Sequence, residues 1–181
     1  MNYSIEKATE KQMDFISEMY WSRTPKWQQN KYNYISFVAV DPMGNIIGYI
    51  VSEEKEIPVP PYGKDWFIVT ITVLKHYRCC GIGSALLEYA STAAQKAGIR
   101  NLQGSANATI EAHSFWSKNK FCFLQYGKQH DDPAKAAEFG NYSHMIFRQV
   151  SDVNICCPEG KTRYCHKFDI ANYIHIKLQR L

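Results

Sequence analysis

The stretch of sequence that decides the fold is residues 66–98, which read WFIVTITVLKHYRCCGIGSALLEYASTAAQKAG. Residues 66–74 are almost unbroken in hydrophobicity, as is typical of a central strand that is buried on both faces. Over residues 84–97, small and apolar side chains recur at helical spacing. Gly98 follows, at the position where a left-handed residue commonly ends a helix. The stretch therefore predicts a strand, a short turn and an amphipathic helix.

The turn, residues 78–84, predicts an anion site. Gly81 and Gly83 have no Cβ, so the backbone can curl and approach a ligand closely. The first turn of a helix has N–H groups without an internal partner and carries partial positive charge, which suits a pyrophosphate. Arg78 can add a charge-assisted hydrogen bond. A P-loop would need Lys after its last glycine, and a dinucleotide fingerprint would need a third glycine where Leu86 stands.

Hydrophobic periodicity and turn residues predict strands and helices around this unit. The predicted strands are residues 3–8, 35–40, 46–52, 66–74, 101–106, 121–126 and 142–150, and the predicted helices are residues 24–32, 84–97 and 109–119. One more helix is predicted after a capping box at Thr9 and Gln12. Residues 53–64 contain Pro58, Pro60 and Pro61 and are predicted to be a loop. The pattern indicates a mixed α/β domain.

Composition narrows the possible functions. A chain of 181 residues fits one domain, and 45% hydrophobic with 21% charged residues argues against disorder. The net charge of +4 is scattered rather than massed, so no nucleic-acid partner is expected. No run of about 18 apolar residues occurs and the N-terminus lacks the pattern of a signal peptide, so a cytoplasmic protein without membrane contact is expected.

The six cysteines are expected to be reduced thiols. Cys156, Cys157, Cys165 and His166 have the side chains of a zinc site, but adjacent cysteines do not match the usual Cys-x-x-Cys pair. No metal is therefore predicted. Cys79 and Cys80, beside the predicted helix N-terminus, are interpreted as small apolar filler, and the alternative is that they form a mixed disulfide with the thiol of a bound ligand.

The spacing Arg78-x-x-Gly81-x-Gly83 after a buried strand resembles the GCN5-related N-acetyltransferase (GNAT) family, whose corresponding loop binds the pyrophosphate of acetyl-CoA through backbone amides. Residues 112–121, with Phe115 and Trp116, are similar to a second element of that family. The resemblance covers residues 66–98 and extends to about 150. It implies a central, mostly antiparallel, twisted sheet of about six to seven strands flanked by about four helices. Residues 1–150 would form the domain and residues 151–181 an extension of it.

The resemblance implies acetyl-CoA as co-substrate, without a metal, and a primary amine of a small molecule or peptide as acceptor. A homodimer is left open. The implied cofactor-binding residues lie on the strand (Ile71, Thr72 and Val73), in the loop (Arg78, Cys79, Cys80, Gly81, Ile82, Gly83 and Ser84) and further along the chain (Asn107, Thr109, Phe115 and Trp116). Backbone groups of the strand would pair with the pantetheine arm.

Acetyl transfer needs a neutral amine, and roughly one lysine-like amine in 2,500 is neutral at pH 7. A general base therefore helps, typically by about 10²–10⁴-fold. The candidate catalytic residues are Tyr126 and Asp65. Trp116 stands where the family often has a tyrosine that protonates the leaving thiolate; an indole N–H can donate a hydrogen bond but cannot release its proton, and core packing is the preferred interpretation.

The carboxylates near the strand, Glu53, Glu54, Glu56 and Asp65, are interpreted chiefly as solvated charges, with the role of base as the alternative. Aromatic residues in the segment that covers the acceptor pocket in the resembled family either form a box for a cationic amine or, as preferred, pack helices onto the sheet; they are Tyr20, Trp21, Trp27, Tyr32 and Tyr34.

An acetyl-CoA-dependent N-acetyltransferase is the leading hypothesis. The alternative is a non-catalytic module of the same fold that binds or senses acyl-CoA. It is motivated by two side chains that are frequent in the family and absent here, the tyrosine at position 116 and an acid on the strand at 67–70. A third hypothesis is a partner-binding protein that uses residues 151–181 and has no affinity for coenzyme A.

Overall fold

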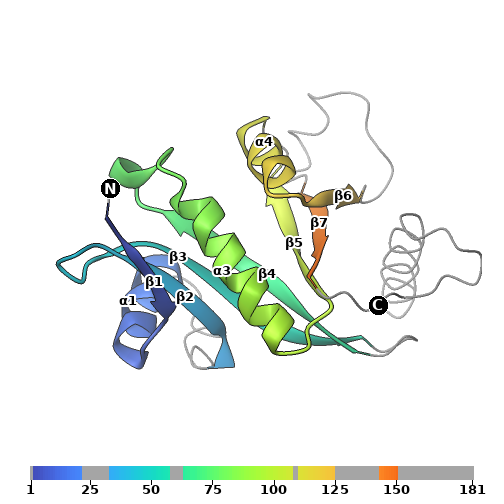
Figure 1. Ribbon diagram of the computed structural model, residues 1–181, viewed down its shortest axis with the longest axis horizontal. Helices are drawn as coiled ribbons and strands as arrows, with labels where there is room; N and C mark the ends of the chain where they lie inside the picture. Colours follow the sequence, from blue (N-terminus) through green and yellow to red (C-terminus); the bar gives the residue numbers. More distant parts are fainter. Residues whose placement is uncertain (1, 22–32, 58–62, 108–109, 125–142, 151–181) are drawn as a thin grey trace, which may run out of the picture. The chain divides into compact units, whose positions relative to one another are not determined.

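The computed structural model describes residues 2–21, 33–57, 63–107, 110–124 and 143–150 (Figure 1). The helices are α1 (Glu10–Trp21), the short 3-10 helix η2 (Lys75–Tyr77), α3 (Ile82–Lys96) and α4 (Ile110–Lys118). The strands are β1 (Ser4–Lys7), β2 (Ile35–Val40), β3 (Ile46–Ile57), β4 (Gly63–Val73), β5 (Asn101–Asn107), β6 (Cys122–Leu124) and β7 (Ser143–Gln149).

The chain divides into two compact units. The first consists of Met1–Lys55 and Trp66–Ala97, and the second of Glu56–Asp65 and Gly98–Leu181. Strand β4 belongs to both units: residues 63–65 lie in the second unit, and residues 66–73 lie in the first.

In the first unit the strand order is β1-β2-β3-β4, and β2 pairs antiparallel with β1 and β3. Asp41 closes the β2–β3 turn, since its carboxylate accepts a hydrogen bond from the N–H of Asn45 at 2.9 Å. Gly44 in the same turn has φ +83°, a conformation that glycine adopts without steric cost. The predicted hairpin is confirmed.

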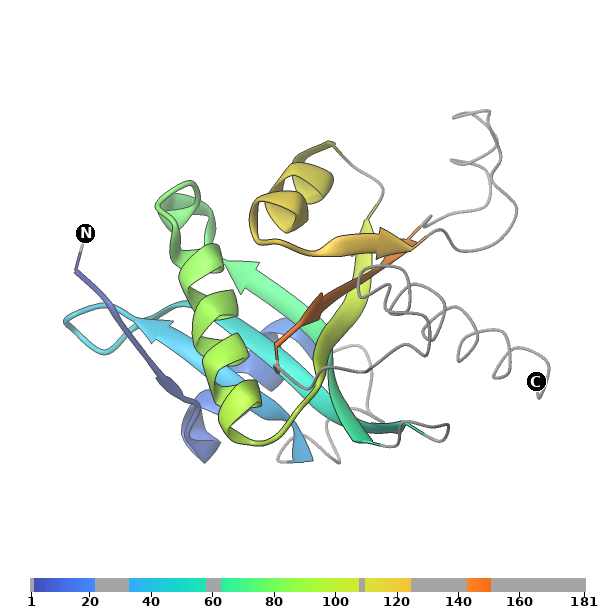
Figure 2. The ribbon, with the colours of Figure 1, turned by 45° about the vertical axis from the view of Figure 1, so that its right-hand side comes forward.

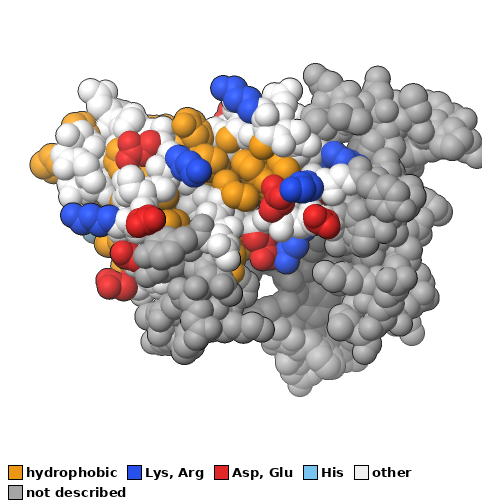
Figure 3. All heavy atoms as spheres, turned by 90° about the horizontal axis from the view of Figure 1, so that it is seen from below, with side chains coloured by type: hydrophobic (Ala, Val, Ile, Leu, Met, Phe, Trp, Pro, Cys, Tyr) orange, Lys and Arg blue, Asp and Glu red, His pale blue; other side chains and the backbone are white. Residues whose placement is uncertain are grey.

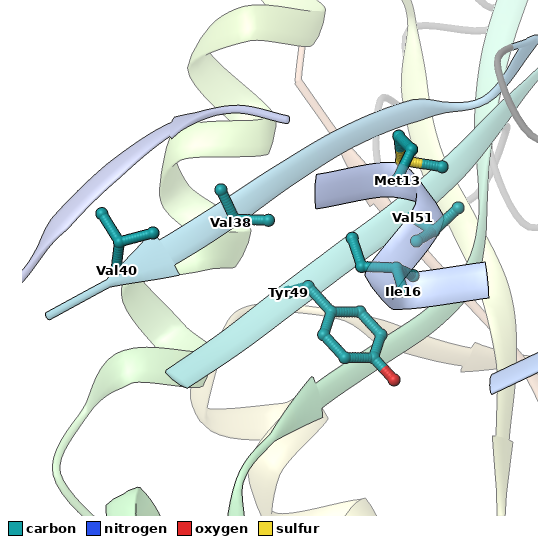
Figure 4. Close-up of a cluster of buried hydrophobic side chains, with 6 residues drawn as sticks. All are labelled: Met13, Ile16, Val38, Val40, Tyr49 and Val51. Carbon is teal, nitrogen blue, oxygen red and sulfur yellow. The ribbon is translucent and has the colours of Figure 1, made fainter. Parts of the chain in front are cut away.

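Helices α1 and α3 cover opposite faces of β2 and β3 (Figures 1 and 2). On the α1 side, Met13 and Ile16 lie against four side chains of the two strands, Val38, Val40, Tyr49 and Val51 (Figure 4). The predicted capping box starts this helix: the N–H of Thr9 donates to Oε1 of Gln12 at 2.8 Å, and the N–H of Gln12 donates to Oγ1 of Thr9 at 3.3 Å.

On the other side, Gly48 lets α3 lie close to β3. A Cβ at Gly48 would come within 3.1 Å of the carbonyl oxygen of Thr72 and 3.2 Å of Cγ2 of Ile82. Ile82, Leu86 and Leu87 are fully buried. The apolar stripe predicted for this helix therefore faces the sheet and fixes the position of the first turn of α3.

In the second unit, β7 pairs antiparallel with β5 and β6, and the first residues of β4 adjoin β5. The N–H of Arg100 donates to the carbonyl of Lys64 at 3.0 Å. Helix α4 packs on β5. Trp116 is buried and lies edge-on to Phe115 and Phe121, with ring centroids 5.1 and 4.8 Å apart.

The predicted fold class is confirmed: strands and helices are mixed, the sheet has seven strands, and the pairs described are antiparallel. One prediction is wrong. Residues 53–64 are not a loop throughout, because β3 continues to Ile57 and β4 starts at Gly63. The three prolines that suggested a loop lie outside the described residues, and the charged residues before them continue β3. The predicted helix at 24–32 and the extension at 151–181 lie outside the described residues, so the division at 150 stays a prediction.

Charged side chains of both signs are intermingled on the face seen in Figure 3, and hydrophobic side chains gather between them. Within the described ranges, no helix is long and apolar enough to cross a membrane. Over the same ranges, no three His, Cys, Asp or Glu side chains gather in a group that could hold a metal ion. The candidate zinc ligands at 156–166 lie outside these ranges.

Candidate functional site

The end of β4 is tied to the turn that follows it. The N–H of Leu74 donates to the carbonyl of Ile47 on β3 at 2.9 Å, and η2 begins directly afterwards. Nε of Arg78 donates to the carbonyl of Val73 at 3.0 Å. Arg78 is exposed, so its guanidinium is fixed beside the end of β4 while it still faces solvent.

Two residues of the turn have left-handed backbone conformations. Cys79 has φ +61° and Gly81 has φ +80° with ψ −5°. Gly81 is the N-cap of α3 and its carbonyl accepts the first helical hydrogen bond, from the N–H of Ala85 at 3.0 Å. The chain therefore reverses between η2 and α3 within four residues, 78–81.

The first amides of α3 are free to bind an anion. No side chain caps the helix, and in the described part of the chain no acceptor takes the N–H groups of Ile82, Gly83 or Ser84. Gly81 is exposed, and Gly83 and Ser84 are half-buried, so side chains of the protein do not cover this turn. Free amides and the partial positive charge of a helix N-terminus make a site for a phosphate group.

The side chains of the loop differ in their roles. That of Ile82 is 1% exposed and packs above Gly48, so only its backbone can reach a ligand. Cys79 and Cys80 are exposed free thiols, and Sγ of Cys80 donates to the carbonyl of Arg78 at 3.4 Å. The interpretation of these two cysteines as apolar filler is therefore wrong: the turn projects them away from the core.

On β4, the predicted cofactor-binding residues Ile71, Thr72 and Val73 are half-buried. Further along the chain, Phe115 is half-buried on α4, and Asn107 is the last residue of β5. Thr109 and Tyr126 lie outside the described residues. The buried position of Trp116 agrees with the preferred interpretation that it packs in the core.

Asp65 is not a solvated charge. It is 2% exposed, and its carboxylate accepts hydrogen bonds from Nδ2 of Asn101 at 3.0 Å and from Nε2 of Gln103. The backbone N–H of Asn101 also donates to it, at 3.2 Å. Burial raises the pKa of Asp65, although these hydrogen bonds and the charge of Arg100 oppose the increase. The carboxylate thus links the start of β4 to β5.

Sequence reasoning did not pick out Lys55 and Phe67. Nζ of Lys55 lies 2.6 Å from Oε1 of Glu53 and 5.9 Å from the centroid of the Phe67 ring. No local signal marked them, because residues 53–56 are all charged and lack hydrophobic alternation, and the three prolines that follow favour a loop.

The sequence matches the acetyltransferase (GNAT) family over residues 3–121. The chain belongs to this family. The match includes β4, the turn with free amides and α3, so the resemblance inferred from residues 66–98 is confirmed. Among curated proteins, none matches the sequence.

Solved structures of several acetyltransferases have the same fold. NAA60 of Arabidopsis thaliana in complex with acetyl-CoA is 13% identical with a TM-score of 0.65, over 82% of this chain and 99% of that chain. The ribosomal-protein alanine N-acetyltransferase of Escherichia coli is 14% identical with a TM-score of 0.62, over 86% and 99%. IAA acetyltransferase from Bacillus cereus is 19% identical with a TM-score of 0.58, over 82% and 99%. Identities this low establish the fold alone.

Proposed function

We propose that this protein is an acetyl-CoA-dependent N-acetyltransferase that acts on a primary amine of a small molecule or peptide. The observation that carries the proposal is the open first turn of α3, where three consecutive amides have no acceptor among the described residues. Membership of the acetyltransferase family supports it, as does the complex of NAA60 with acetyl-CoA.

In this proposal the diphosphate of the donor binds the N–H groups of Ile82, Gly83 and Ser84. Arg78 contributes a charge from the edge of the turn. The backbone of residues 71–73 pairs with the pantetheine arm. The amine then attacks the acetyl carbon as a neutral lone pair, a C–N bond forms and the C–S bond breaks. The nitrogen gives up one proton, and coenzyme A leaves as a thiol after its sulfur gains one.

Of the two predicted catalytic residues, Asp65 fits the role of base poorly. Its oxygens already accept hydrogen bonds from Asn101 and Gln103, and it is buried. A base must reach the acceptor amine directly or through one water. We therefore assign Asp65 a structural role and keep Tyr126 as the proposed acid.

Release of coenzyme A thiol from acetyl-CoA over a broad panel of amines tests the proposal, with calorimetry of acetyl-CoA binding beside it. Acetyl-CoA is expected to bind, and at least one amine is expected to release thiol in proportion to the acetylated product. A folded protein that does not bind acetyl-CoA would refute the proposal.

A second function is an acyl-CoA-binding module without catalysis. The buried Trp116, in place of a tyrosine, and the engaged Asp65 favour it. It predicts that acetyl-CoA binds and that no amine of the panel is acetylated. Turnover with any amine excludes it.

A further inference from the structure

An ionic cluster lies on the α1 side of the first unit, beyond its hydrophobic core. Tyr49 and Val51 of β3 face α1 (Figure 4), and since strand side chains alternate, Glu53 and Lys55 continue the same face. Tyr34 packs against the core on this side. Phe67 of β4 joins them, because the Lys55 ammonium lies over its ring.

The ammonium group of Lys55 already occupies the position beside the Glu53 carboxylate and the Phe67 ring. Nζ of Lys55 lies 2.6 Å from the Glu53 carboxylate and 5.9 Å from the centroid of the Phe67 ring, and the two charged side chains are 40% and 27% exposed. Burial raises the pKa of Tyr34, and the negative charge of Glu53 adds to this. A carboxylate, an ammonium and an aromatic face thus meet where solvent and solutes can reach them.

Stability does not explain the pair. Exposed ion pairs typically contribute about 0–1 kcal/mol, so the fold gains little from this one. The other carboxylates near the strand are less suited to receive a solute. Asp65 is engaged by Asn101 and Gln103, and alternation directs Glu54 to the opposite face of β3.

We propose that Glu53 and Lys55 bind an acceptor that carries both an amine and a carboxylate, as a free amino acid does. Glu53 and the face of Phe67 hold the amino group, and Lys55 turns to hold the carboxylate. The inference rests on the proposed acetyltransferase function and names the acceptor class of that enzyme.

Charge balance selects this class of acceptor. A simple cationic amine would leave two cations, itself and Lys55, beside one carboxylate. A simple carboxylate would compete with Glu53 for Lys55. A zwitterion replaces the one internal ion pair by two intermolecular pairs, and no charge is left without a partner.

The test compares free amino acids with their carboxamides as acceptors, by release of coenzyme A thiol from acetyl-CoA. The best free amino acid is expected to exceed its carboxamide by about tenfold or more in kcat/KM, the ratio that one lost charged contact of about 1.4 kcal/mol produces. Lys55→Gln is expected to bring this ratio close to one by raising KM for the acid alone. Glu53→Gln is expected to raise KM for both acceptors.

Matched controls are Lys96→Gln, in the exposed last turn of α3, and Glu54→Gln, on the opposite face of β3; both are expected to keep the wild-type ratio. Equal use of acid and carboxamide, a ratio that Lys55→Gln leaves unchanged, or amine acetylation without any use of amino acids would overturn the inference. Calorimetry of acetyl-CoA without acceptor separates the two proposals. If the wild type does not bind acetyl-CoA, the proposed function itself fails and the acceptor assignment with it.

Discussion

Gly81 and Gly44 have nearly the same positive φ, +80° and +83°, and a Cβ on either would meet no atom within 4 Å. A side chain at either position therefore brings the same kind of backbone strain and no clash within the protein. Only Gly81 stands at the open amides of α3. Comparing substitutions at Gly81 and Gly44 therefore distinguishes the energetic cost of a left-handed conformation from the loss of an anion-binding site.

We expect Gly81→Val to weaken acetyl-CoA binding by at least about tenfold, because the branched side chain strains the turn and occupies the approach to the amides. Gly44→Val is expected to leave the affinity within about twofold. Both variants should lose on the order of 1–2 kcal/mol of stability, the cost of a left-handed conformation for such a residue. Calorimetry and denaturant unfolding of the three proteins measure the two effects. Equal loss of affinity in both variants would contradict the assignment of the site.

At the residue scale, local chemistry was readable from the sequence and distant partners were not. Gly81 and Gly83 could be interpreted locally: because glycine has no Cβ, two glycines at this spacing before a helix indicate that the backbone approaches a ligand closely. The environment of Asp65 depends on Asn101 and Gln103, which are 36 and 38 residues away. No local pattern indicates that such amides will meet a given carboxylate.

At the scale of elements, the boundaries of α3 and of strands β2, β5 and β7 could be predicted within about two residues. Their periodicity and their bounding residues agree, as at Gly98, which has φ +72° after α3. The lengths of β3 and β4 could not be predicted. Residues 53–56 near the end of β3 and residues 64–65 near the start of β4 are charged, so neither stretch shows the hydrophobic pattern of a strand.

The junction of β4 and β5 makes stability depend on pH through Asp65. Burial raises the pKa of Asp65 in the folded protein, whereas an unfolded Asp has a pKa of about 3.9. The folded state therefore binds more protons between these two values. The stability that protonated Asp65 contributes is complete below the unfolded pKa and is lost as pH rises through the folded one.

Asp65→Asn removes this titration, so we expect the stability of the wild type relative to the variant to fall as pH rises from 4 to 7. The variant should lose on the order of 1–3 kcal/mol at pH 4, because an amide offers one acceptor oxygen to three donors. Asp41→Asn is the control of opposite sign. The hydrogen bonds of Asn45 lower the pKa of Asp41, so the stability of the wild type relative to this variant should fall as pH drops below the unfolded pKa of about 3.9. Denaturant unfolding on both sides of that pKa and up to pH 7 measures both effects, and slopes of the same sign would refute the argument.

At the scale of the whole molecule, β4 joins the two compact units without a break in the strand. Residues up to Asp65 belong to one unit and residues from Trp66 to the other. Asp65 and Trp66 are consecutive residues of this strand, and both are buried. We therefore expect both units to unfold in one cooperative transition.

Binding at the open turn of α3 should stabilise this whole transition. A donor at 100 times its Kd adds about 2.7 kcal/mol, which for a protein of this length raises Tm by roughly 5–10 °C. Coenzyme A and acetyl-CoA should both do so, whereas pantetheine, which lacks the diphosphate, should not. Melting followed by near-UV and far-UV circular dichroism should give one midpoint that moves with the donor in both signals. If the midpoints separate and the donor moves only one of them, the units unfold independently; if pantetheine stabilises as well as coenzyme A, the amides of α3 do not hold the diphosphate.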